Sequence, residues 1–189
     1  MARVPEFFAR SEPNPQAPPD VKELMDKTAS KSGFLPNVFS ALSHRPDEFR
    51  SFFNYHDALM NSESLLTKAE KEMIVVATSA INDCLYCVVA HGAILRIRAK
   101  DTTLSERVAT DYKRAGLSKR HEAILDFATK VASRANEVDE NDFEPLYEVG
   151  LGENEIWEIG AITAFFAMSN RLAGFAKILP NSEFYSLGR

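Results

Sequence analysis

Excess positive charge, long apolar runs and cysteine are scarce or absent in the sequence, and each absence excludes some classes of function. It has no excess of positive charge: 27 acidic and 22 basic residues give a formal net charge of -5. This balance argues against nucleic acid or an anionic membrane surface as the main partner. No apolar run approaches the length of a membrane span, and no apolar signal-peptide region follows residues 1–5. We therefore expect a cytoplasmic protein with no membrane partner.

Cysteine is also scarce, because Cys84 and Cys87 are the only two in the chain. In a reducing compartment a Cys-x-x-Cys pair indicates catalysis or metal binding rather than a permanent disulfide. This pair is the feature from which a specific function can be inferred.

The pattern of apolar residues after residue 20 is helical. Val21, Leu24 and Met25 have the i, i+3, i+4 spacing of one helix face. Start signals such as Pro46 and the capping box from Thr67 to Glu70 recur, and helices are expected to begin near residues 20, 46, 67, 84, 104, 118, 139 and 153. No β-hairpin dipeptide flanked by alternating apolar residues occurs. The sequence predicts an all-α bundle of about seven or eight helices, formed by a single domain over residues 20–189.

Residues 1–19 differ from the rest by their prolines, which are Pro5, Pro13, Pro15, Pro18 and Pro19. Proline fits neither a helix interior nor a central strand. We expect an N-terminal arm that wraps its own core or a neighbouring subunit, or else a loose tail.

The two cysteines share one predicted helix face with a histidine. The i, i+3, i+7 spacing of Cys84, Cys87 and His91 places them within a stripe of roughly 60°. Asp83 is suited to cap this helix, which would put Cys84 in the first turn. The unpaired backbone amides of a first turn favour a thiolate, the reactive form of cysteine.

Glu72 is predicted to lie beside His91. Only Asn82 and Asp83 separate the two helices, so we expect a tight antiparallel hairpin. Glu72 lies about ten residues before this turn and His91 about eight after it, which gives them similar depths. Glu72 would then orient His91 and hold its proton on one ring nitrogen.

Together these residues predict thiol-based reduction of a hydroperoxide without a cofactor. His91, supported by Glu72, takes a proton from Cys87, directly or through a water. The Cys87 thiolate attacks the terminal oxygen of the hydroperoxide, an alcohol leaves, and Cys87 becomes a sulfenic acid. Cys84 condenses with it, water leaves and a disulfide closes, which an external dithiol reduces.

Other interpretations of the same residues stay open. The cysteines could be inert core residues. The four residues could bind zinc, although structural zinc sites usually combine two separated Cys/His pairs and this chain has one. Glu72 could be a solvated surface charge, and Tyr86 could line a pocket or simply pack. His44, His56 and His121 show no partner pattern, and we expect them to be surface or core residues.

The motifs resemble those of a known family. Glu72-x11-Cys84-x2-Cys87-x3-His91 is similar to the signature of the AhpD-like alkylhydroperoxidases in the carboxymuconolactone decarboxylase superfamily. Residues 33–39 (GFLPNVF), 86–91 (YCVVAH) and 170–172 (NRL) resemble the "peroxidase-related" branch of that superfamily. The resemblance covers most of the chain after the arm.

This resemblance implies an all-helical fold, homo-oligomers and hydroperoxide reduction through the cysteine pair. It implies that Cys87 is the peroxidatic cysteine, that Cys84 resolves it, and that Glu72 and His91 form the proton relay. The partners would be a hydroperoxide and an external dithiol, or a thioredoxin-like or peroxiredoxin redox partner. Well-studied members carry a second histidine directly before the later cysteine. Tyr86 stands there in this chain, and a phenol stays protonated near neutral pH and cannot replace that base.

The sequence therefore predicts a cysteine-dependent alkylhydroperoxidase, an antioxidant enzyme. One alternative is a redox sensor whose disulfide changes its contacts with a partner without turnover. Another is a lyase of the carboxymuconolactone decarboxylase type, which works without redox cysteines. The presence of both cysteines argues against the lyase.

Overall fold

The computed structural model describes residues 5, 7 and 10–189, and this part of the chain is helical with no strand. It contains nine α-helices: α1 (Pro19–Ser32), α2 (Asn37–Leu42), α3 (Pro46–Met60), α4 (Lys68–Ile81), α5 (Leu85–Ala99), α6 (Leu104–Asp111), α7 (Lys119–Arg134), α8 (Glu144–Glu148) and α9 (Glu153–Ala176). Four 3₁₀ segments accompany them: η1 (Tyr112–Arg114), η2 (Ala135–Glu137), η3 (Glu140–Asp142) and η4 (Ser182–Tyr185). The all-α prediction is confirmed. The sequence did not predict α2, because its six residues are too few to show a period.

Local sequence signals explain most helix ends. Gly33 ends α1 with φ of 83°, a left-handed conformation that glycine adopts at little cost. Thr67 and Glu70 form the predicted capping box at the start of α4. The Ser118 side chain accepts from the backbone N–H of His121 and starts α7, also as predicted.

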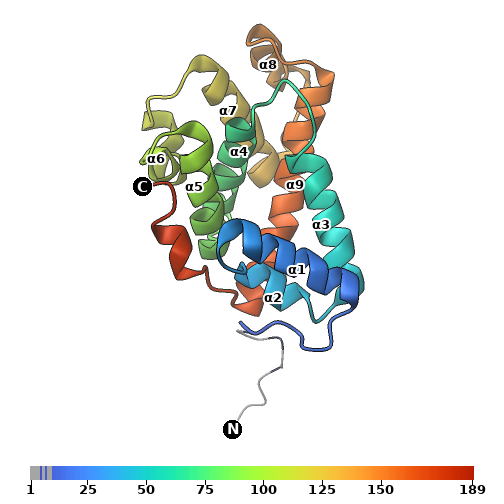
Figure 1. The fold of residues 1–189 in the computed structure, drawn as a ribbon. Helices are drawn as coiled ribbons and strands as arrows, with labels where there is room; N and C mark the ends of the chain where they lie inside the picture. Colours follow the sequence, from blue (N-terminus) through green and yellow to red (C-terminus); the bar gives the residue numbers. More distant parts are fainter. Residues whose placement is uncertain (1–4, 6, 8–9) are drawn as a thin grey trace.

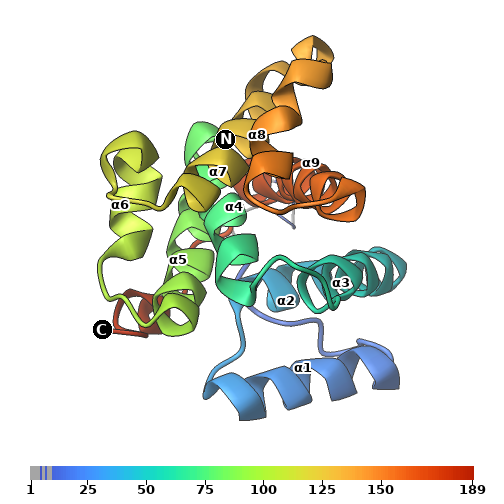
Figure 2. The ribbon, with the colours of Figure 1, turned by 90° about the horizontal axis from the view of Figure 1, so that it is seen from above.

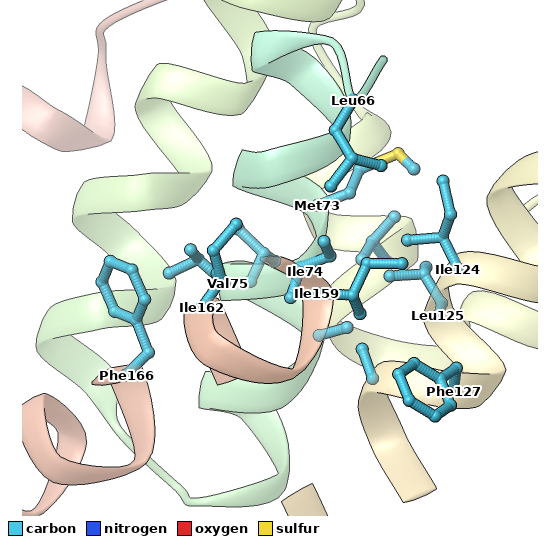
Figure 3. Packing of buried hydrophobic residues seen from close by; sticks show 14 of the residues in the cluster. Leu66, Met73, Ile74, Val75, Ile124, Leu125, Phe127, Ile159, Ile162 and Phe166 are labelled. Carbon is cyan, nitrogen blue, oxygen red and sulfur yellow. The ribbon is translucent and has the colours of Figure 1, made fainter. Parts of the chain in front are cut away.

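The helix α4 lies at the centre of the bundle. It packs against α5, α6, α7 and α9, and the views in Figures 1 and 2 show it enclosed by these helices. Ten consecutive residues, 70–79, are buried within it. Side chains from α4, α7 and α9 meet in the main core, which Figure 3 shows from close by. This packing fixes the position of α4, the helix that carries Glu72.

A buried ion pair connects α4 to α9. Nζ of Lys71 lies 2.5 Å from Oε1 of Glu158, and the two side chains are 1% and 10% exposed. The same ammonium donates to the backbone oxygens of Leu59 and Ser62, each at 3.0 Å. These contacts join the end of α3 and the following loop to the core.

The described part of the N-terminal segment lies against its own chain. The backbone N–H of Asn14 donates to Oγ of Ser43 at 2.8 Å, and Ala17 is buried. The ring of Phe7 meets that of Phe175 with centroids 5.5 Å apart. Residues 1–4, 6, 8 and 9 of the predicted arm lie outside the described residues.

The helix α9 is long and apolar enough to cross a membrane by length and composition, with a mean hydropathy of 1.2. Within the described part of the chain it is the one helix that meets this test. Ile159, Ile162, Phe165 and Phe166 of α9 are buried in the bundle. Packing in the core thus accounts for part of its apolar character, while Trp157, Met168 and Phe175 are exposed.

Candidate active site

The turn between α4 and α5 places the cysteines. Asp83 adopts a left-handed conformation with φ of 51°, and it does not cap α5 as the sequence suggested. Cys84 itself is the N-cap residue: its sulfur accepts from the backbone N–H of Cys87 at 3.3 Å, and α5 begins at Leu85. A left-handed residue reverses the chain here, which makes the hairpin tight. The sulfur takes the position where a capping oxygen usually lies.

Glu72 and His91 are in contact across this hairpin. Oε2 of Glu72 lies 2.8 Å from Nδ1 of His91, and the side chains are 10% and 13% exposed. The alternative that Glu72 is a solvated surface charge is therefore wrong. A carboxylate at Nδ1 holds the ring proton there and leaves Nε2 as the acceptor of a neutral imidazole. The ring of Phe166 meets His91 edge-on at 4.7 Å and shields the pair from the side of α9.

The two cysteines are free thiols, and both are buried, at 3% exposure for Cys84 and 1% for Cys87. A hydrogen bond from the Cys87 thiol is the largest cause that lowers the pKa of Cys84 to about 7. Burial opposes this shift, while the backbone N–H groups of Cys87 and Tyr86 and the side chain of Asn170 add to it. The pKa of Cys87 is raised, because its proton is held by Cys84 and because burial and the Cys84 charge disfavour a second thiolate.

The thiolate of the pair is therefore favoured at Cys84, with the Cys87 thiol as its hydrogen-bond donor. Cys84 is thus the more acidic thiol, whereas the sequence predicts that Cys87 attacks the hydroperoxide. Within the described residues His91 makes no hydrogen bond to either sulfur, so its proposed action on Cys87 requires an intervening water or the substrate itself.

Polar residues of α9 complete the surroundings of the sulfurs, and the sequence analysis did not assign them a role. Asn170 favours the thiolate of either cysteine, and Ser169 favours that of Cys87. Asn170 is held in place because Asn82 donates to its Oδ1 at 3.0 Å and its own Nδ2 donates to Oγ of Ser79 at 2.9 Å. The sequence does carry one signal for this role, which is an asparagine within a strongly apolar helix. Such a residue needs polar partners once the helix is buried.

Tyr86 packs between elements. It is 6% exposed, and its hydroxyl oxygen accepts from the backbone N–H of Val38 at 3.3 Å. Burial raises the pKa of its phenol. Of the two alternatives considered for Tyr86, the structure shows packing, with the hydroxyl directed at the start of α2.

The remaining histidines have partners after all. Nε2 of His44 is 3.0 Å from the backbone oxygen of Glu12, and Nε2 of His121 is 3.7 Å from Oε1 of Glu70. His56 lies near the site, with its ring centroid 6.4 Å from that of His91.

The described residues contain no group of three or more His, Cys, Asp or Glu side chains arranged to hold a metal ion.

Known proteins resemble this chain in sequence and in fold. Residues 46–107, which include all four predicted site residues, match the carboxymuconolactone decarboxylase family. A solved peroxidase-related protein from Ralstonia eutropha, described as an alkylhydroperoxidase AhpD core, is 50% identical. It covers 98% of each chain with a TM-score of 0.94. The chain belongs to the AhpD-like, peroxidase-related family.

Other comparisons show the breadth of the AhpD-like fold. A peroxidase-related protein from a Silicibacter species is 35% identical over 100% of each chain, with a TM-score of 0.91. The debrominase Bmp8 in complex with 2,3,4-tribromopyrrole shares the fold at 17% identity, with a TM-score of 0.77 over 94% of each chain. No curated protein matches the sequence. Family membership supports an enzyme of the peroxidase and decarboxylase superfamily with a peroxidase-related role.

Proposed function

We propose that the protein is a thiol-dependent alkylhydroperoxidase that uses the Cys84–Cys87 pair and the Glu72–His91 relay. The observation that carries this proposal is the α4–α5 hairpin, which holds a buried carboxylate–histidine pair and two buried free thiols, of which Cys84 has a lowered pKa. Cysteine peroxidases need a stabilised thiolate, a second thiol and a route for protons. The hairpin offers each of these.

In the oxidative half of the reaction, Cys87 attacks the terminal oxygen of the hydroperoxide. The O–O bond breaks, Cys87 becomes a sulfenic acid, and the departing alkoxide takes a proton from the relay to leave as an alcohol. The Cys84 sulfur then attacks the sulfenic sulfur, and hydroxide leaves with a proton as water. The dithiol protein and one hydroperoxide thus yield a disulfide, one alcohol and one water.

The acidity order can be reconciled with attack by Cys87. The Cys87 thiol donates to the Cys84 thiolate, so one proton transfer along this hydrogen bond moves the charge to Cys87. Ser169 and Asn170 favour the resulting Cys87 thiolate. Cys84 then carries the proton until the disulfide closes. Attack by Cys84 is the reverse assignment, and single-cysteine variants separate the two.

In the reductive half, an external dithiol attacks the Cys84–Cys87 disulfide and leaves oxidised. A small dithiol, or a thioredoxin-like or peroxiredoxin partner, supplies the two electrons. We also propose a cytoplasmic location, because a reducing compartment maintains such a cycle. The homo-oligomer that the family resemblance implies is part of the same proposal.

The test is a coupled assay of the reduced protein with an alkyl hydroperoxide and excess dithiol. We expect Cys87→Ser to be inactive. Cys84→Ser should undergo a single round of oxidation and accumulate a sulfenic acid, which dimedone labelling and mass spectrometry detect. If Cys84→Ser forms sulfenic acid more slowly than Cys87→Ser, the two roles are reversed.

The same assay separates the alternatives. A redox sensor would form the disulfide once per molecule and would not consume hydroperoxide in excess of protein. A lyase of the decarboxylase type would be indifferent to both cysteine substitutions. Sustained hydroperoxide consumption that depends on Cys87 contradicts both.

A further inference from the structure

A second histidine lies beside the relay, on a helix that carries none of the four predicted site residues. His56 is on α3, and its ring centroid is 6.4 Å from that of His91 on α5. The ring centroids of Phe165 and Phe166 on α9 lie 6.1 and 6.2 Å from that of His56. Phe166 also meets His91 edge-on, with 4.7 Å between the ring centroids. The two histidines therefore share one aromatic wall.

Each of these histidines has a carboxylate at the same ring nitrogen. Nδ1 of His91 is 2.8 Å from Oε2 of Glu72, and Nδ1 of His56 is 3.0 Å from Oδ1 of Asp57. The side chains of His91 and Glu72 are 13% and 10% exposed, whereas those of His56 and Asp57 are 27% and 60% exposed. In each pair Nε2 is the nitrogen left for a further partner. An inner and an outer histidine–carboxylate pair thus lie next to each other.

Hydroperoxide reduction requires the inner pair to exchange protons with solvent. Each cycle delivers protons to an alcohol and a water, and the dithiol restores them. His91 is nearly enclosed, and Phe166, whose ring meets that of His91, is 1% exposed. Apolar rings cannot pass a proton. His56 combines a titratable ring next to His91 with contact to solvent.

We propose that His56 carries protons between solvent and His91, so that the relay continues from Glu72 and His91 to His56 and opens on the exposed side of α3. This inference rests on the proposed function. The two ring centroids lie 6.4 Å apart, and in this proposal one bridging water passes the proton between the rings. His56 acts through His91 and is a positioning residue for the proton path, since it does not touch the sulfurs.

The charged groups around His56 suit this role. The hydrogen bond from His56 is the largest cause that holds the pKa of Asp57 below its ordinary value, and Lys31 of α1 adds to it. From α5 and α4 the groups facing His56 are His91 and, behind it, Glu72. The helix α9 presents aromatic rings. A carboxylate therefore lies at Nδ1 of each of the two imidazoles.

The test is steady-state turnover with an alkyl hydroperoxide and dithiol for His56→Ala, His56→Gln and the control His121→Gln on α7. We expect kcat of both His56 variants to fall about 10²-fold, the low end for a positioned proton-transfer group. The KM for hydroperoxide and the control should not change. Added imidazole should restore turnover of His56→Ala in proportion to its concentration, a response that a purely structural role does not give.

The results for the His56 variants either support the proposed proton path or overturn it. Wild-type turnover by His56→Ala, with no response to imidazole, overturns this inference, while an inactive Cys87→Ser in the same assay preserves the proposed function. If the wild-type protein consumes no hydroperoxide, the proposed function fails first and the inference with it. If circular dichroism shows His56→Ala unfolded, His56→Gln and Asp57→Asn carry the comparison. Slow turnover with an enlarged solvent deuterium isotope effect supports the path, and wild-type values overturn it.

Discussion

Oε2 of Glu72 on α4 lies 2.8 Å from Nδ1 of His91 on α5. The two residues meet because the chain reverses direction between the two helices. Both side chains are nearly buried, at 10% and 13% exposure. A carboxylate is costly to bury without a partner, so this contact is needed by the fold as well as by the proposed chemistry.

The first prediction concerns this contact. Glu72→Gln keeps the shape of the side chain but removes the charge that fixes the His91 proton, and we expect kcat for hydroperoxide to fall about 10²-fold. The matched control is Glu63→Gln, the same change on an exposed residue. The measurement is turnover at several hydroperoxide concentrations. Equal rates for the two variants would remove Glu72 from the relay.

The second prediction concerns the acidity of Cys84. Its pKa is lowered to about 7, so the thiolate should be present above about pH 7 and disappear as the pH falls below it. Ultraviolet absorbance of the thiolate during a pH titration measures this. Cys87→Ala removes the main donor and should raise the midpoint, whereas Cys87→Ser retains a hydroxyl donor and should raise it less. A midpoint that does not respond to Cys87→Ala would contradict the shared hydrogen bond.

The third prediction concerns Asn170. Asn170→Ala removes a donor that favours both thiolates, so the pKa of Cys84 should rise and less thiolate should be present at neutral pH. The titration described for Cys84 reports the shift. Asn54→Ala, an exposed position on α3, serves as the control. Identical midpoints for both variants would show that Asn170 only supports packing.

The fourth prediction concerns the ion pair of Lys71 and Glu158. Lys71→Met leaves the Glu158 carboxylate without its cation, and the free energy of unfolding should fall by about 3–5 kcal/mol. Denaturant unfolding measures the loss. Replacing both partners, as Lys71→Met with Glu158→Leu, should recover part of it, because two apolar groups leave no buried charge. A single variant no less stable than the double variant would contradict this.

The pH dependence of that loss has a definite sign. Burial alone would raise the pKa of Glu158, but hydrogen bonds from Lys71 and Ser62 outweigh burial and lower it. The wild-type protein therefore has this stabilisation above the ordinary carboxyl pKa and loses it as the pH falls. In Lys71→Met the carboxyl is neutralised more readily. The difference between the two proteins should shrink on acidification.

The predictable part of the molecule is the part that local sequence determines. The capping box at Thr67, the stop at Gly33 and the cap at Ser118 act within a few residues, and all three are where the sequence places them. The contact of Glu72 with His91 was also predictable, because a short turn fixes which depths of two helices face each other.

The rest depends on contacts between distant segments. Asn170 reaches the cysteines from α9, and His56 reaches His91 from α3, and neither approach has a periodic signal. The order of acidity follows from donors that gather only when the helices pack. The conformation of Asp83 was missed for another reason: aspartate is common both as a helix cap and in left-handed turns.

The sulfur of Cys84 also has a structural duty, because it is the atom that begins α5. When a disulfide takes up that sulfur, it becomes a poorer acceptor for the Cys87 N–H, so oxidation should loosen the first turn of the helix. Amide exchange at this turn would then read out the redox state without any substrate. Substitution is affected in the same way: serine keeps a capping atom, whereas alanine removes it at a cost of about 1 kcal/mol. A loss of activity in Cys84→Ala would therefore mix chemistry with a frayed helix, and serine is the cleaner replacement.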